Sequence, residues 1–197
     1  MPRLVDRDER RALIVDAYLR IVSRSGVAAA TSRALAAEAE ISTGALWHYF
    51  DGYGDVVRDA FQRVYTQTNE RIAAAGMGRR GVAALDAMAF DILPHDTATR
   101  DEAVVVVSFW GLLPAHAEFR EQARTVEADW GRQVSTHLRE AIEDGELVPS
   151  TPVPTLTDAL LAVYEALQLR EVQGSPTAQP ERQRALLEHL IQPWRAS

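Results

Sequence analysis

The fold is decided by the stretch TSRALAAEAEISTGALWHYF, residues 31–50. Thr31 and Ser42 are residue types that favour the N-cap of a helix, and each precedes a short helix-forming run. Two short helices joined by a turn of about three to four residues make a helix-turn-helix, whose second helix enters the major groove of DNA. The alternative is a corner between two helices of an ordinary helical core, with the aromatic residues as packing.

The second of these helices has two different faces. Leu46 and Phe50 are four residues apart, so both can pack inward. The outer side then carries small residues, which permit close approach to base edges, and two side chains whose N–H groups can bind phosphate or bases. These outer residues are Thr43, Gly44, Ala45, Trp47 and His48.

The composition indicates a globular protein and excludes several kinds of site. Of the 197 residues, 47% are hydrophobic and 25% charged, which is typical of a folded chain. The absence of cysteine excludes disulfides, thiolate metal sites and cysteine nucleophiles. The apolar stretch 103–113 is shorter than a membrane span, and the N-terminal MPRLVDRDERR lacks the apolar region of a signal peptide. We therefore expect a cytoplasmic protein.

The net charge of −7 argues at first against a nucleic-acid partner, but the charge is unevenly distributed. Seven arginines and six acidic residues precede residue 51, a balance of +1, so the remainder carries −8. An acidic body with a nearly neutral, arginine-bearing end suits a protein that contacts DNA at one end only. This support is weak, because +1 is not a basic patch.

The rest of the chain is predicted to be all-α, with about nine helices. Prolines fall at helix ends, and the segments between them are rich in alanine, leucine, glutamate and arginine. A run of valines at 104–107 is strand-like in propensity, but no turn signal follows it, so we favour a buried helix. The predicted helices are 7–25, 32–39, 43–50, 54–75, 80–93, 99–113, 115–144, 154–173 and 180–192.

Residues from about 7 to 65 resemble the DNA-binding domain of the TetR (tetracycline repressor) family. The matching elements are a first helix ending at Ser25-Gly26, then Thr31-Ser32-Arg33, Leu35-Ala36, Ile41-Ser42-Thr43-Gly44, Leu46-Trp47-His48-Tyr49-Phe50 and Asp55-Val56-Val57. The remainder is more loosely similar to the C-terminal domains of choline-sensing members, on the basis of Phe109-Trp110 and residues 141–147. The resemblance implies a DNA-binding domain at 1–53, and a ligand-binding and dimerisation domain at 54–197, with helix 54–75 as the connector.

The resemblance also implies which residues contact DNA. Arg33 would reach a base or a phosphate, and the start of the third helix would read the major groove. This chain departs from the family pattern in three places. Glu40 stands in the turn where the family usually has glycine. At the start of the fourth helix, Tyr53-Gly54 replaces a sequence that contains a lysine, and Asp51 adds a negative charge nearby. These departures predict a shallower dependence of DNA affinity on salt. The full predicted set is Ser32, Arg33, Thr43, Gly44, Ala45, Trp47, His48, Tyr49 and Tyr53.

Family members bind DNA as homodimers through their last two long helices. The DNA-binding domains of the two subunits would sit about 34–36 Å apart, in successive major grooves, which implies a palindromic operator. The alternative is that both helices pack only onto their own subunit. The predicted interface residues are Leu156, Leu160, Val163 and Leu167 on one helix, and Leu186, Leu187, Leu190 and Ile191 on the other.

The body is expected to enclose a cavity for a small-molecule effector, which would shift the heads and release DNA. An aromatic cage for a quaternary ammonium group would suit its tryptophans. For each aromatic residue taken singly, ordinary core packing is the alternative. The predicted ligand-binding residues are Phe90, Phe109, Trp110, Trp130, Gln133, His137 and Tyr164, with Phe119, His95 and His116 as further candidates.

Two other classes of function compete with a DNA-binding regulator. An enzyme is disfavoured because HExxH, GxSxG, GxGxxG and phosphate-loop motifs are all absent, and no cofactor is expected. A DNA-binding or scaffolding dimer without a sensor would have a filled body in place of a cavity. The expected function is thus a ligand-responsive transcriptional repressor, with repression taken from the family resemblance.

Overall fold

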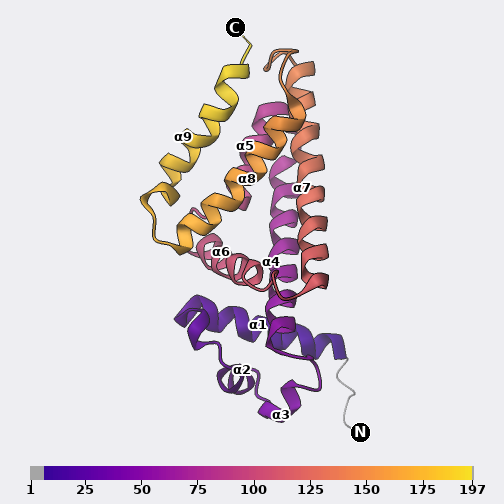
Figure 1. Ribbon diagram of the computed structural model, residues 1–197, viewed down its shortest axis with the longest axis vertical. Coiled ribbons are helices and arrows are strands. Elements are labelled where there is room, and N and C mark those ends of the chain that lie inside the picture. The colour runs from indigo at the N-terminus through magenta and orange to yellow at the C-terminus, as the bar shows by residue number, and fades with distance from the viewer. Residues whose placement is uncertain (1–6, 197) are drawn as a thin grey trace.

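The computed structural model describes residues 7–196, in which all the long elements are helices (Figure 1). The predicted all-α class, with about nine helices, is confirmed, and the valines at 104–107 lie inside a helix. The α-helices are α1 (Arg7–Ser25), α2 (Ser32–Glu38), α3 (Thr43–Leu46), α4 (Tyr53–Gly76), α5 (Gly81–Ile92), α6 (Thr97–Trp110), α7 (Ala117–Glu143), α8 (Val153–Val172) and α9 (Pro180–Ile191). Short 3₁₀ turns are η1 (Val27–Ala29), η2 (Pro176–Ala178) and η3 (Gln192–Trp194).

The helices form a small head and a larger body. Helices α1, α2 and α3 make the head at the lower end of Figure 1, and α4 leads from it into the body. Helix α6 packs against α1 and η1 of the head as well as against α4 and α8. In the body, α7 packs on α5 and α8, while α9 packs on α8.

Helices α2 and α3 each begin at a side-chain cap, and the turn between them contains a left-handed residue. The Thr31 hydroxyl accepts from the backbone N–H of Ala34 at 3.2 Å, and the Ser42 hydroxyl accepts from that of Ala45 at 3.1 Å. Both predicted N-caps are thus confirmed. Glu40 has φ 55°, a left-handed conformation that costs a residue with a side chain about 1–2 kcal/mol. This is the turn position where the family pattern has glycine.

Helix α3 is shorter than the predicted 43–50, because it ends at Leu46. The backbone then tightens: His48 N–H bonds to the Ala45 carbonyl, and Tyr49 N–H to that of Leu46. Such three-residue spacing is typical of 3₁₀ turns at helix ends. It turns the chain so that the side chain of Phe50 enters the core, where it is 2% exposed.

Two hydrophobic cores lie along the molecule. The first joins the head to α4, α6 and the beginning of α7, and the second is formed by α5, α7, α8 and α9 with the upper part of α4. At the junction of head and body, the ring of Phe109 stacks on Phe61 with a centroid distance of 4.0 Å and lies 5.7 Å from the ring of Phe119. The head is therefore packed onto the body through aromatic side chains.

Replacement of Phe109 by alanine is expected to lower the free energy of unfolding by about 3–5 kcal/mol, since a fully buried ring leaves a cavity. The matched control is Phe90→Ala, because Phe90 is 56% exposed and its loss should cost less than about 1 kcal/mol. Urea unfolding followed by circular dichroism, at equal protein concentration, measures both values. Equal losses in the two variants would contradict the assigned packing.

Candidate DNA-binding surface and body cavity

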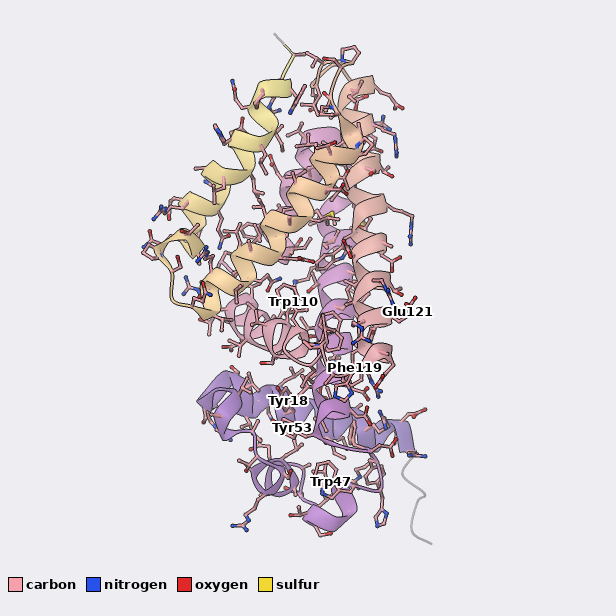
Figure 2. The ribbon with its side chains drawn as sticks, viewed as in Figure 1. Tyr18, Trp47, Tyr53, Trp110, Phe119 and Glu121 are labelled. Carbon is pink, nitrogen blue, oxygen red and sulfur yellow. The ribbon has the colours of Figure 1, made fainter. Side chains whose placement is uncertain are left out.

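The outer side of α2 and α3 presents several of the predicted DNA-contacting residues to solvent. Arg33, Thr43, Gly44 and His48 are exposed, and Trp47 is 39% exposed at the far end of the head (Figure 2). Arg33 makes no ion pair with any residue in the described range. Ser32, Ala45 and Tyr49 lie at the edges of this surface and are partly buried.

Tyr53 is a correction to the predicted surface, because it points into the head. Its hydroxyl donates a hydrogen bond to the carbonyl of Ala30, and its ring packs edge-on against Tyr18 at 6.1 Å. Burial raises the pKa of Tyr53. The residue at the start of α4 therefore stabilises the head and leaves no hydroxyl free for phosphate.

The arginines of α1 have structural partners that the sequence did not indicate. The Arg11 guanidinium donates to the carbonyl of Tyr49, pairs with Asp59 and lies 4.3 Å above the ring of Phe50. Arg7 donates to the carbonyl of His48 at 3.5 Å. Both arginines thus hold the segment that follows α3 against α1 and α4.

Two further arginines of α1 share one carboxylate of the head. Arg20 and Arg24 pair with Glu38 at 2.9 and 3.0 Å, and their hydrogen bonds lower the pKa of that carboxyl. This carboxylate offsets one of the two positive charges, and both arginine side chains stay more than half exposed. Arg33, at the start of α2, is exposed and makes no ion pair among the described residues.

The body contains a cavity of about 380 Å³ among α4, α6, α7 and α8. Trp110, Trp130 and Tyr164, which the sequence analysis predicted, all line it, together with Tyr65 and Phe61 from α4. Figure 2 shows Trp110 above the junction marked by Phe119. The indole N–H of Trp130 donates to the Asn69 side chain at 3.1 Å, so its polar group is satisfied.

Charged side chains also line the cavity. Of its two arginines, Arg120 donates to the carbonyl of Leu113 at 2.7 Å and keeps its charge without an ion pair in the described part of the chain, while Arg124 pairs with Glu121 at 2.7 Å on the exposed surface. Glu127 and Glu165 form no ion pair within residues 7–196. Burial of the carboxyl, and then the nearby Glu127, raise the pKa of Glu165. The cavity therefore combines aromatic walls with charged side chains of both signs, and two of its carboxylates, Glu127 and Glu165, form no ion pair within the described residues.

Four predicted ligand residues lie outside this cavity. Phe90 is exposed beside a groove between α5 and α9, and Phe109 is completely buried in the aromatic junction. Gln133 faces a shallow hollow between α4 and α7, while His137 bonds to Glu140 at 2.9 Å. The spacing of apolar residues predicts which faces of a helix are apolar, but not which of those faces line a cavity.

The acidic residues of the cavity, Glu102, Glu127 and Glu165, were missed in the sequence. One signal existed for Glu165, which interrupts the apolar sequence LLAVYEAL of α8. Glu165 and Glu127 are both exposed, so they line the cavity from its solvent-facing side, where a charged residue on a helix is ordinary. The sequence alone does not place these three carboxylates around one space.

The predicted dimer residues divide into buried and outward-facing groups. Leu156, Leu160 and Leu167 are buried in the core of their own subunit, and Ile191 likewise, so these four are corrected. Val163, Leu187 and Leu190 are partly buried against the same core. Leu186 faces outward and is 40% exposed. The outward faces of α8 and α9 also carry Leu169 and Val172, both exposed.

Among residues 7–196, no group of three or more histidine, aspartate or glutamate side chains is placed to hold a metal ion. No helix in the same range is long and apolar enough to cross a bilayer.

Two family models match the chain. Residues 14–58 match the model for bacterial regulatory proteins of the tetR family, and residues 81–193 match that for the C-terminal domain of BetI-type transcriptional repressors. The first spans the helix-turn-helix, and the second covers more than half of the chain, including most of the helices around the cavity.

Curated relatives and solved structures agree with these matches. The chain is 22% identical over 196 residues to the HTH-type transcriptional regulator PksA of Bacillus subtilis, covering 96% of this chain and 92% of the relative. It is 27% identical over 176 residues to the regulator BetI of Burkholderia lata, covering 86% of each. A transcriptional regulator from Saccharomonospora viridis, in complex with choline, has a TM-score of 0.84 at 18% identity over 96% of this chain and 99% of that one. The protein therefore belongs to the TetR family of transcriptional regulators and carries a BetI-type C-terminal domain.

Proposed function

We propose that the protein is a repressor that binds a palindromic operator as a homodimer and releases it when a small organic cation occupies the body cavity. The observation that carries this proposal is the cavity itself. Its walls combine aromatic rings with unpaired carboxylates, and the same helix, α4, lines the cavity and enters the head.

Contact with DNA is proposed for the exposed side of α2 and α3. Thr43 and Gly44 are small and exposed at the start of α3, where a backbone can approach base edges closely. Arg33 and His48 flank them and can donate hydrogen bonds to phosphate or bases. Arg20 and Arg24 share the carboxylate of Glu38, and the start of α4 has Tyr53, packed into the head, in place of a lysine. A shallow salt dependence follows.

Dimerisation is proposed through the outward faces of α8 and α9. Leu169, Val172 and Leu186 are large apolar side chains left exposed on these two helices. Such a patch suits a self-complementary interface between two copies related by a two-fold axis. Two heads presented at a spacing of about 34–36 Å would then occupy successive major grooves.

The proposed effector is a quaternary ammonium compound such as choline. Trp110, Trp130 and Tyr65 offer aromatic faces, which attract cations through the ring quadrupole. Glu127 and Glu165 add negative charge, and neither forms an ion pair within the described residues, although Arg120 and Arg124 also line the cavity. The similarity in fold to a regulator solved with choline supports the same chemical class.

The competing proposal is a DNA-binding or scaffolding dimer without a sensor. Such a protein needs no space inside its body, and interiors are otherwise close-packed. A cavity of about 380 Å³ beside the connecting helix favours the sensor.

Replacement of Arg33 by alanine should weaken operator binding about tenfold, since one contact to a base or phosphate is lost. The melting temperature should stay unchanged, because Arg33 is exposed and makes no ion pair among the described residues. The operator is first recovered by selection from random duplexes, and fluorescence anisotropy then measures affinity. Arg139→Ala, an exposed arginine on α7, is the matched control. Equal affinities for the two variants would refute the assigned contact.

Replacement of Glu165 by glutamine should weaken choline binding about tenfold, measured by isothermal titration calorimetry. Asp158→Asn, on the same helix but outside the cavity, is the control. The uncharged isostere 3,3-dimethyl-1-butanol should bind both variants and the wild type equally weakly. If glutamine leaves choline affinity unchanged, Glu165 is not a counter-ion.

Choline affinity should also fall as pH decreases. A cation favours the ionised carboxylate, so binding is complete above the pKa of Glu165 and is lost below it. Because that pKa is raised, the loss should begin at a higher pH than for an ordinary glutamate. Titration calorimetry across the acidic range measures this, and the Glu165→Gln variant should show a flatter profile.

A further inference from the structure

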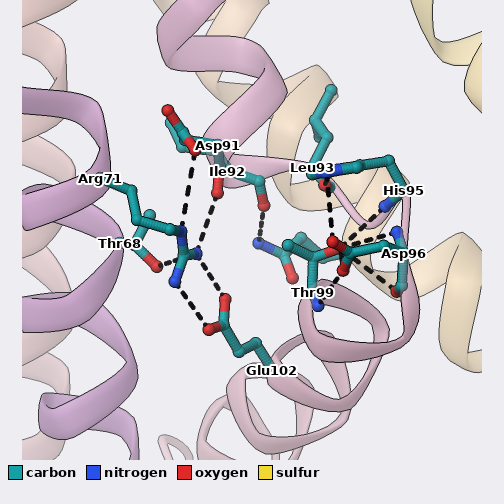
Figure 3. A network of polar contacts seen from close by, with 10 residues as sticks. Thr68, Arg71, Asp91, Ile92, Leu93, His95, Asp96, Thr99 and Glu102 are labelled. Atoms are coloured by element: carbon teal, nitrogen blue, oxygen red, sulfur yellow. Dashed lines mark hydrogen bonds and ion pairs between the residues drawn. The ribbon is translucent and has the colours of Figure 1, made fainter. Parts of the chain in front are cut away.

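An ion pair between α4 and α6 lies at the wall of the cavity. The guanidinium of Arg71 donates to both oxygens of the Glu102 carboxylate, Nη1 to Oε1 at 2.9 Å and Nη2 to Oε2 at 2.7 Å (Figure 3). Such two-pronged pairing is the strongest geometry that arginine and carboxylate adopt. The pKa of Arg71 is raised, first by its hydrogen bonds to Glu102.

Arg71 connects α4 to the body by further contacts. It donates to the Thr68 hydroxyl and to the backbone carbonyl of Asp91, both at 3.2 Å, and its Nε lies 3.7 Å from the Asp91 carboxylate. This one side chain therefore joins α4 to both α5 and α6. Arg71 itself does not line the cavity, whereas Thr68 and Glu102 do.

Helix α4 can carry a displacement from Arg71 to the head. Between residues 55 and 75 it contains no glycine and no proline, the usual causes of a kink. Its beginning is packed in the head through Val56 and Val57. A displacement of α4 at Arg71 should therefore move the whole helix, including its beginning in the head, because no hinge residue lies between them.

We infer that Glu102 is the residue through which the cavity acts on α4. Its carboxylate faces the cavity and also holds Arg71, and both of its oxygens are already used by the guanidinium. A cationic ligand beside Glu102 competes with Arg71 for the same negative charge. When the carboxylate turns toward the ligand, α4 loses this ion pair with α6 and the heads leave their operator spacing. This inference rests on the proposed function, because it assigns the regulation of the same cavity.

The test uses Glu102→Gln and Arg71→Gln in the full chain, with operator affinity measured first without any ligand. Each variant should bind the operator at least about fivefold more weakly than the wild type, because breaking the pair imitates the ligand. The matched control is Glu171→Gln, which breaks the pair of Arg100 and Glu171 between α6 and α8 and leaves α4 alone. Unchanged operator affinity in both test variants would overturn the inference.

The choline affinity of the variants gives a second measurement. If Arg71 only stabilised the fold, its replacement would not raise that affinity. Arg71→Gln should bind choline several-fold more tightly than the wild type, since Glu102 is freed from its partner, and choline should then have little further effect on operator affinity. Weaker choline binding by this variant would overturn the inference. Arg71→Lys keeps the charge but not the paired geometry, so its choline affinity should lie between those of the wild type and Arg71→Gln. This variant replaces the glutamine variants if they do not fold.

The wild-type measurements separate the two proposals. A wild-type protein that binds no duplex overturns both the proposed function and the inference. Operator binding without choline binding refutes the proposed ligand class, while the ligand-free comparison of variants still decides the role of the pair. Operator and choline binding with unaffected variants overturns the inference alone.

Discussion

Helix α4 contributes side chains to both hydrophobic cores, and this constraint ties the position of the DNA-facing helices to the packing of the body. Val56 and Phe61 lie in the core shared with the head, and Ile72 lies in the core of the body. At about 1.5 Å per residue, Val56 and Ile72 are about 24 Å apart along one uninterrupted helix. The head is further held by the stack of Phe61 on Phe109. It cannot be displaced without a change in packing around α4.

The cavity lies where such a change is most effective. Phe61, Tyr65 and Thr68 show that α4 itself forms part of the cavity wall. A ligand of a size to fill this space therefore touches the helix that carries the head. In energetic terms, such a ligand could shift the head only as far as its affinity differs between two arrangements of the helices. The proposed competition for Glu102 between Arg71 and a cationic ligand would give that difference a source.

Local features of the fold were predicted well from the sequence, and spatial ones were not. The N-caps Thr31 and Ser42 and most helix limits follow from residue types within a few positions. The strained turn at Glu40 was visible as a departure from a family pattern. By contrast, Phe109 and Trp110 are adjacent in sequence, yet one is in the junction and the other lines the cavity. The direction of each side chain is set by helix rotation, which depends on all neighbouring helices together. For the same reason the leucines of α8 were assigned to a dimer surface although three of them fill their own core.

The central claim is that the head and the cavity are two sites of one equilibrium. Thermodynamic linkage then requires that the operator change choline affinity by the same factor as choline changes operator affinity. The most direct measurement is the dissociation constant of choline for the protein alone and for the protein saturated with operator duplex, by calorimetry at one salt concentration. The account predicts weaker choline binding in the presence of the operator, by the factor found in the reciprocal experiment. Equal choline affinity in both states would contradict it.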